Sequence, residues 1–144
     1  MSGIIGGAGS KSGVIGTTEL DYEEGTFTAT ARNGNNATAY YTKIGNLVKF
    51  AISIWNIAST GGSAEFHITG LPFTPDIADV AISVGPTHQV NTPTNGVVLR
   101  AKCGDGDVSV LFYWQKDDDA YGISTCTDFD SGSAGIQVSG TYMT

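Results

Sequence analysis

The side chains best suited to metal binding or nucleophilic catalysis are few, and they are widely spaced along the sequence. They are two histidines and two cysteines: His67, His88, Cys103 and Cys126. A zinc site needs about four converging ligands, and no C-x-x-C or other metal-binding spacing occurs here. The Gly-x-Ser-x-Gly turn that presents a nucleophilic serine is also absent. The sequence therefore predicts no catalytic residue and no metal ligand among these side chains, and ordinary surface histidines are the favoured interpretation.

Carboxylates are more numerous, and several lie close together in the last third of the chain. They are Asp117, Asp118, Asp119, Asp128 and Asp130. Calcium prefers several oxygen ligands, but the EF-hand loop pattern is not met. Paired carboxylates can also hydrolyse glycosides, but no predicted element places two of them in a recognisable cleft. Both chemistries remain minor alternatives to solvated acidic loops.

A glycine-rich stretch near the N-terminus, Gly6–Ser12, has some features of a phosphate-binding loop. Ser10 occupies the position before Lys11 where that motif requires glycine, and no strand precedes the stretch. The dinucleotide pattern Gly-x-Gly-x-x-Gly, started at Gly7, fails at Ser12. Neither nucleotide-binding motif is present, so no cofactor is expected.

Composition limits the possible partners. The 144 residues carry a net charge of −7 and only seven Lys and Arg residues, which argues against nucleic-acid binding. No apolar run approaches the ~20 residues of a membrane-spanning helix, so no membrane association is expected. Charged residues make up 15% of the chain, a low share that fits a surface largely covered by partners. Without a signal peptide, we expect Cys103 and Cys126 to remain buried or semi-buried thiols, with a disulfide between them as the less favoured alternative.

Period-two alternation of apolar and polar residues predicts strands throughout the chain after the N-terminal stretch. Its centre is Tyr40–Ile57, where a break at Ile44–Asn46 separates two runs and predicts a hairpin. No helical periodicity is found. Nine strands are expected, at Thr26–Ala31, Ala37–Lys43, Leu47–Ile57, Ala64–Thr69, Ile77–Val84, Val97–Cys103, Val108–Trp114, Tyr121–Cys126 and Ile136–Tyr142. Nine short strands at this spacing favour an all-β fold, with a jelly-roll-like β-sandwich as the expected topology.

Three stretches, in order, resemble a recurrent module of bacteriophage virion proteins. They are DYEEGTFTAT at Asp21–Thr30, YYTKIGNLVKF at Tyr40–Phe50 and ITGLPF at Ile68–Phe73. The module occurs in tail-fibre tips and in small virion-surface proteins. The opening MSGIIGGAGSKSGVIG at Met1–Gly16 is similar to the first residues of small phage structural proteins. The resemblance spans roughly the first half of the chain, and from about Asp76 no motif is matched.

The glycine-rich opening is expected to be an extended assembly arm, 1–16, ahead of a β-sandwich domain, 17–144. Its few apolar side chains cannot offset the conformational entropy of its glycines, so it cannot fold alone. They would instead anchor the arm in a groove of another subunit: Ile4, Ile5, Val14 and Ile15. A terminus with no such role is the alternative. In the domain, Trp55 and Tyr41 are candidates for a subunit interface.

The resemblance and the low charge together imply a non-enzymatic structural protein of a phage virion. We expect a homotrimeric capsid decoration, or cement, protein on the virion surface, with the major capsid protein as its partner. The alternative is a tail-fibre or tail-tip module that recognises host surface glycans. In that alternative, specificity would lie in the loops Gly85–Gly96 and Lys116–Ala120, although neither loop contains an aromatic residue for sugar stacking.

Overall fold

The computed structural model describes residues 21–144, except 33–34, 59–60, 104–105, 118 and 130–131. The predicted assembly arm, with Ile4, Ile5, Val14 and Ile15, therefore lies outside the described residues.

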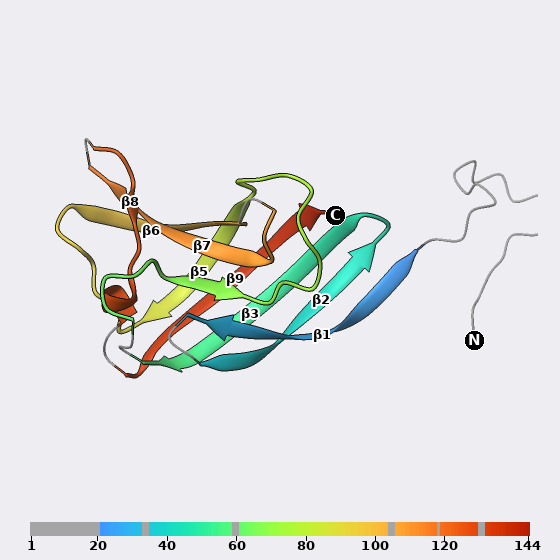
Figure 1. The fold of residues 1–144 in the computed structure, drawn as a ribbon, viewed down its shortest axis with the longest axis horizontal. Coiled ribbons are helices and arrows are strands. Elements are labelled where there is room, and N and C mark those ends of the chain that lie inside the picture. The colour runs from blue at the N-terminus through green and yellow to red at the C-terminus, as the bar shows by residue number, and fades with distance from the viewer. Residues whose placement is uncertain (1–20, 33–34, 59–60, 104–105, 118, 130–131) are drawn as a thin grey trace, which may run out of the picture.

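The described chain is almost entirely β-structure, which confirms the all-β prediction (Figure 1). Its elements are β1 (Tyr22–Ala31), β2 (Asn36–Ile44), β3 (Leu47–Ile57), β4 (His67–Thr69), β5 (Ala81–His88), β6 (Gly96–Cys103), β7 (Ser109–Lys116), β8 (Gly122–Ile123), the short 3-10 helix η1 (Cys126–Phe129) and β9 (Ala134–Met143).

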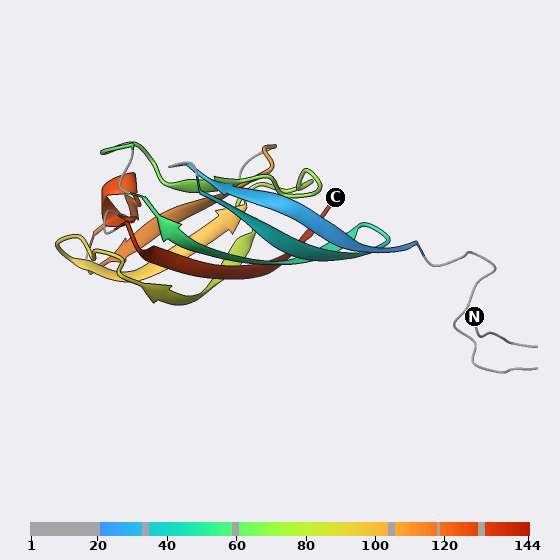
Figure 2. The ribbon, with the colours of Figure 1, turned by 90° about the horizontal axis from the view of Figure 1, so that it is seen from below.

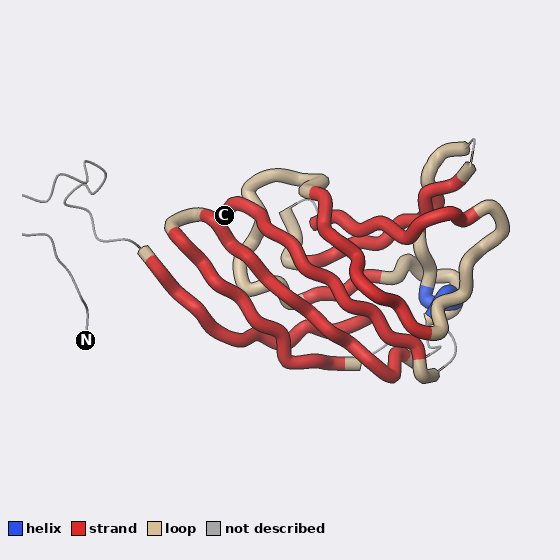
Figure 3. Tube along the Cα trace, turned by 180° about the vertical axis from the view of Figure 1, so that it is seen from behind, coloured by secondary structure: helices blue, strands red, loops and turns tan. Residues whose placement is uncertain are grey.

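All strand pairs among these elements are antiparallel, and the strands form one continuous sheet in the order β4-β1-β2-β3-β9-β5-β6-β7-β8. The sheet closes on itself because β4, the first strand in this order, also pairs with β7. β4 and β8 both pair along the same edge of β7. Seen from the side, the closed sheet is flattened, and the long strands β1, β2, β3 and β9 lie side by side (Figures 2 and 3). The jelly-roll-like sandwich is not confirmed, since the strands do not divide into two separate sheets.

The central hairpin forms as the sequence pattern predicts. β2 and β3 pair from Tyr40 opposite Ala51 to Ile44 opposite Leu47, and Gly45 takes a positive φ of 58° in the turn between them. From Leu47 to Trp55 the side chains of β3 alternate strictly between surface and core, with Val48, Phe50, Ile52 and Ile54 in the core; Ile57, after a register shift against β9, is also buried. A period of two buries one face of a strand, which is why apolar residues at every second position favour this structure.

Aromatic rings from several elements meet in the interior of the closed sheet. Phe66 stacks on Phe129 with ring centroids 3.8 Å apart, and its centroid lies 5.3 Å from that of Phe112. Phe50 and Tyr142 pack together at 5.9 Å. All five side chains are almost fully buried, so the two sides of the flattened, closed sheet share one core.

Elsewhere the strands differ from the predicted ones. β5 begins at Ala81 rather than Ile77 and runs to His88, into the segment predicted as the loop Gly85–Gly96. Its register against β9 shifts between Val84 and Thr87. Pro86 lies in this irregular stretch, and a bulge accommodates a residue that has no N–H to donate.

Two predicted strands are also shorter than expected. β4 contains only His67–Thr69 instead of Ala64–Thr69, and β8 contains only Gly122–Ile123 instead of Tyr121–Cys126. The chain after β8 turns into η1, which begins at the residue where the strand was expected to end.

Candidate functional site

The outward side of β1, β2, β3 and β9 is a broad surface with very little charge, which we call the uncharged face. Because these strands pair in regular register, alternate side chains share this side of the sheet. Among its described residues only Glu24 and Lys49 are charged, and the others with side chains on this face are Tyr22, Thr26, Thr28, Thr30, Asn36, Thr38, Tyr40, Thr42, Ile44, Leu47, Ala51, Ser53, Trp55, Gln137, Ser139, Thr141 and Met143.

Tyr40 projects from the middle of the uncharged face and is 64% exposed. Beside it lies an open hollow of about 320 Å³, lined by small and polar side chains such as Thr38, Ser53 and Ser139. Three further large side chains of this face, Tyr22, Ile44 and Leu47, are exposed by about half. Apolar and aromatic surface of this kind favours contact with another macromolecule.

Trp55, predicted at a subunit interface, lies at one end of the uncharged face with 49% of its surface exposed. Its indole packs against Gly135, where any Cβ would collide with the ring. The ring centroid also lies 5.8 Å from that of His88, and Nε1–H donates to Ser53 Oγ at 3.0 Å. These contacts hold the indole in place while leaving about half of it open.

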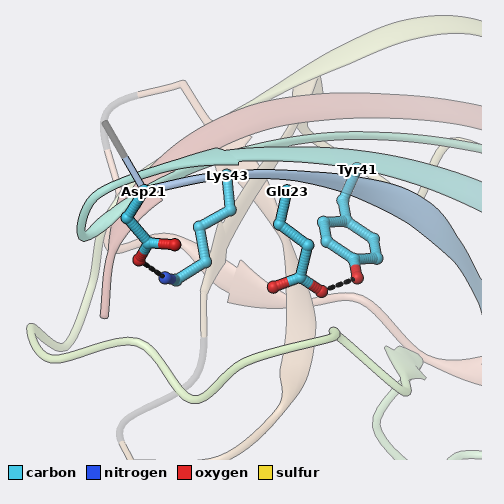
Figure 4. A network of polar contacts seen from close by, with 4 residues as sticks. All are labelled: Asp21, Glu23, Tyr41 and Lys43. Carbon is cyan, nitrogen blue, oxygen red and sulfur yellow. Dashed lines mark hydrogen bonds and ion pairs between the residues drawn. The ribbon is translucent and has the colours of Figure 1, made fainter. Parts of the chain in front are cut away.

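Tyr41, the other predicted interface residue, lies on the inner side of β2. Its hydroxyl donates to the carboxylate of Glu23 (Figure 4). Its ring meets that of Phe73 edge-on, with centroids 5.4 Å apart. The hydrogen bond to Glu23 raises the pKa of Tyr41 above its ordinary value of 10.0. Beside it, Lys43 Nζ and Asp21 Oδ2 form an ion pair at 2.9 Å. The structure thus places Tyr40, rather than Tyr41, on the uncharged face.

A second surface feature lies on the outward side of β5, β6, β7 and the segment before β8. It is an open hollow of about 370 Å³, and we call it the tyrosine–arginine hollow. Its polar and aromatic residues are Asp79, Arg100, Lys102, Tyr113, Gln115 and Tyr121. Arg100 faces Tyr113 directly across the β6–β7 ladder, and alternation places Lys102 and Gln115 on the same side.

Side chains in this hollow hold one another in place. Lys102 Nζ forms an ion pair with Asp79 and lies 4.9 Å from the centroid of the Tyr113 ring. The hydrogen bond to Asp79 is the main reason that the pKa of Lys102 is raised. On the other side of the hollow, Arg100 donates from Nε and Nη2 to Gln115 Oε1 at 3.2 and 3.0 Å.

Tyr121 forms the most exposed wall of the hollow. It is 66% exposed, and its ring meets that of Tyr113 nearly at right angles, with centroids 5.0 Å apart. The sequence alone does not indicate this hollow, because its residues come from separate segments between Asp79 and Tyr121. The available signal was the alternation that places Arg100 and Lys102 on one side of the predicted strand Val97–Cys103, followed along the chain by the predicted strand that contains Tyr113.

The histidines do not come together with other ligands. His67 lies on β4, and burial lowers its pKa. His88 lies on β5, and its Nδ1 is 3.3 Å from the carbonyl oxygen of Ser133. Within the described ranges, no three His, Cys, Asp or Glu side chains converge as a metal site.

Asp128, weighed above as a calcium ligand in a solvated loop, is instead buried. Its Oδ2 accepts hydrogen bonds from Trp114 Nε1 at 2.8 Å, Ser124 Oγ at 3.0 Å and the backbone N–H of Thr125 at 2.9 Å. Three donors on one oxygen of a buried carboxylate fix the start of η1 and the edge of the core. Asp128 therefore stabilises the fold through these hydrogen bonds and does not lie in a solvated loop.

Cys103 and Cys126 are both buried thiols, and no disulfide joins them. Burial raises the pKa of Cys103 to about 11 and also raises that of Cys126. A buried thiol with a raised pKa is a poor nucleophile at neutral pH. Neither cysteine offers a reactive centre.

No protein-family model matches this chain, and no curated protein matches its sequence. The part of the chain that the structure describes has no helix long and apolar enough to cross a membrane. The two surfaces described above therefore have to be interpreted from their own chemistry.

Proposed function

We propose that this chain is a non-enzymatic structural protein of a bacteriophage virion, a decoration protein that forms a homotrimer and bridges major capsid subunits. The uncharged face is the observation that carries the assembly part of this proposal. The virion context comes from the resemblance of Asp21–Thr30, Tyr40–Phe50 and Ile68–Phe73 to phage virion modules.

The uncharged face is unlike the free surface of a small monomer. Such a surface typically has ~25–35% charged residues of both signs, whereas only Glu24 and Lys49 are charged among the described residues of this face. It carries exposed Tyr40 and Trp55, the residue types enriched at interface centres. A second copy of the chain is the occupant that we propose for it.

The flat area of the face is of the same order as one side of a standard protein interface. Four neighbouring strands of about ten residues, at ~3.3 Å per residue and ~4.8 Å between strands, cover about 600 Å². Standard interfaces bury about 800 Å² per partner. In the proposed trimer the face of each copy would be shared between its two neighbours around a threefold axis.

Attachment to a capsid would follow from the same assembly. A trimer that binds only where capsid subunits meet stabilises the assembled shell by mass action. The proposed arm, 1–16, would provide the anchor through Ile4, Ile5, Val14 and Ile15. Deleting residues 1–16 should then leave a folded trimer that no longer incorporates into particles.

The trimer is tested by placing a charge at the centre of the uncharged face. Ala51 is exposed on β3 opposite Tyr40, so Ala51→Glu should leave the fold intact and bury an unpaired carboxylate in the interface. We expect a trimer for the unmodified chain and a monomer for this variant, measured by light scattering after size-exclusion chromatography.

The matched control is Val97→Glu, which puts the same charge at a 59% exposed position on β6. This variant should remain trimeric. A monomeric unmodified chain, or an Ala51→Glu variant that still forms trimers, would contradict assembly through the uncharged face.

The second candidate is a tail-fibre or tail-tip module that recognises host glycans, and the tyrosine–arginine hollow favours it. Its paired tyrosines and planar polar groups are suited to binding sugars. Antibody labelling of intact particles viewed by electron microscopy separates the candidates. Label over the head supports decoration, and label at the tail end supports host recognition.

A further inference from the structure

We propose that the tyrosine–arginine hollow is a binding site for a carboxylate-bearing saccharide. This inference does not depend on the trimer. In the closed strand order β6 lies four places from β2 and β7 lies four places from β3, so the hollow opens on the side opposite the uncharged face.

The hollow has the size and lining of a small-ligand site. Its volume of about 370 Å³ falls in the range of roughly 300–1,000 Å³ that is usual for such sites. It exists because Ala81, opposite Lys102 in the β5–β6 ladder, has a side chain too short to fill the space. The rings of Tyr113 and Tyr121, in edge-to-face contact, form an aromatic wall.

An aromatic wall beside hydrogen-bonding side chains suits a pyranose ring. One face of a pyranose presents C–H groups, which pack on an aromatic ring, while its hydroxyls both donate and accept hydrogen bonds. Tyr121 is 66% exposed and is available for this packing. The carboxylate of Asp79 can accept from sugar hydroxyls, and the amide of Gln115 can donate to them.

The charge of the hollow selects an acidic sugar. Lys102 is paired with Asp79, whereas Arg100 makes no ion pair with any described residue and contacts the neutral amide of Gln115. The hollow therefore has one excess positive charge on a protein whose net charge is −7. A guanidinium binds a carboxylate with paired hydrogen bonds, and an Arg100 whose charge is not neutralised by a carboxylate of the described residues favours that group.

The polar groups are already held in position without a ligand. Asp79 takes a positive φ of 62°, an uncommon conformation for a residue other than glycine, and its side chain forms an ion pair with Lys102. Lys102 lies over Tyr113, Tyr113 supports Tyr121, and Gln115 holds Arg100. Side chains that are already ordered lose less entropy when a ligand binds, which favours affinity.

The test is a titration of the full chain with 3′-sialyllactose, with lactose and acetate as matched probes. Binding is measured by calorimetry and by shifts of the tyrosine resonances in NMR spectra. We expect 3′-sialyllactose, or a glucuronic acid disaccharide tested in parallel, to bind with a Kd on the order of 0.1–1 mM. Lactose and acetate should each bind at least tenfold more weakly, since each lacks one of the two recognised features.

Variants then assign binding to the hollow. Tyr121→Ala should weaken binding about tenfold, and Tyr121→Phe should retain it because the ring remains. Arg100→Gln should remove the preference for the acidic sugar over lactose, whereas Arg32→Gln, an exposed control outside the hollow, should change nothing. Ala81→Phe should block the hollow and abolish binding while the melting temperature stays within a few degrees.

Several results would overturn the proposal. One is the absence of binding by either acidic saccharide at 10 mM. A Kd of 10 mM would correspond to binding ~2.7 kcal/mol weaker in standard free energy than a Kd of 0.1 mM. Another is equal affinity for lactose and the acidic saccharides. Acetate binding as tightly as 3′-sialyllactose would identify a simple anion site instead. Binding unchanged in Tyr121→Ala and Ala81→Phe would place the saccharide elsewhere. The Ala51→Glu variant is expected to be a monomer that still binds the acidic saccharide. The oligomeric state and saccharide binding are therefore measured independently, and a failure of the trimer proposal can be told apart from a failure of this one.

Discussion

The two sides of the closed sheet differ in how regularly their strands pair. β1 and β2 pair without interruption from Tyr22 opposite Ile44 to Thr30 opposite Asn36, and β3 pairs with β9 without a shift from Leu47 to Ile54. On the other side, β5 pairs with β6 at two positions only, and β4 and β8 are three and two residues long. The regular side carries the uncharged face, and the irregular side carries the tyrosine–arginine hollow.

This difference shows how each surface arises. Uninterrupted ladders keep side chains in rows and produce a broad, flat surface suited to another flat surface. Where a ladder is short, backbone groups and side chains need other partners, and the hollow lies where the two-pair β5–β6 ladder adjoins the longer β6–β7 ladder. The buried carboxylate of Asp128 and the Asp79–Lys102 pair both occur on this side. The regular side thus offers area for the assembly that we propose, and the irregular side offers the local recognition site that we propose.

The largest expected effect tests whether both sides depend on one core. Phe112 on β7 and Phe50 on β3 are 0% and 1% exposed, one on each side of the closed sheet. Phe112→Ala and Phe50→Ala should each lower the free energy of unfolding by about 3–5 kcal/mol, because each leaves a large cavity. Urea unfolding followed by tryptophan fluorescence measures this.

Phe112→Leu serves as a milder control, with a smaller loss expected because most of the buried volume is kept. A loss below ~1 kcal/mol for either alanine variant would mean that its side is not packed into a shared core. The two sides of the sheet would then be independently stable halves rather than parts of one core.

The second effect is the pH dependence of stability, which involves one buried titratable group on each side of the sheet. Burial raises the pKa of Cys103 on β6 to about 11 and that of Tyr142 on β9 to about 12. The folded state then holds these protons more tightly than the unfolded state, whose groups titrate near 9 and 10. Stability is therefore complete below pH ~9 and falls as the pH rises from about 9 to 12.

At about 1.4 kcal/mol per unit of pKa difference, each group contributes on the order of 3 kcal/mol. Urea midpoints between pH 8 and pH 12 should fall progressively, and Cys103→Ala should remove the part between about pH 9 and 11. A midpoint that stays constant up to pH 11 would show that Cys103 is accessible to solvent rather than buried.

The same contrast explains how much of the molecule could be predicted from sequence. Regular alternation located β3 at Leu47–Ile57, with the bounds that the structure shows, and it placed Phe50 and Ile54 in the core. Alternation fails where ladders are interrupted. The extension of β5 beyond Pro86 depends on a bulge, and the burial of Asp128 depends on a donor in Trp114, fourteen residues earlier in the chain.

The hollow could not be predicted because no single segment contains it. Arg100 and Tyr113 become neighbours only through the β6–β7 register, and Asp79 reaches Lys102 only from its left-handed backbone conformation. The predicted alternation gave the side of the strand for each residue. It could not give the strand order that places them together.

A smaller effect tests whether the irregular side depends on side-chain hydrogen bonds. Asp128→Asn keeps the shape of the side chain but removes the charge and weakens the acceptor for Trp114, Ser124 and Thr125. We expect a loss of about 1–3 kcal/mol in unfolding free energy and faster amide hydrogen exchange in η1. Asp107→Asn, at an exposed position, is the control and should change neither. Unchanged exchange in η1 would mean that the backbone alone holds this region.

The smallest effect is expected for the matching carboxylate on the regular side. Asp21 pairs with Lys43 at 2.9 Å, but its side chain is 68% exposed, so water and salt screen the interaction (Figure 4). Asp21→Asn should therefore lower the unfolding free energy by less than ~1 kcal/mol, and the loss should shrink further in 0.5 M salt. The β1–β2 ladder, paired through its backbone from Tyr22 to Thr30, accounts for this tolerance. If Asp21→Asn costs as much as Asp128→Asn, the regular side also depends on its side-chain contacts, and ladder length does not explain the difference between the two sides.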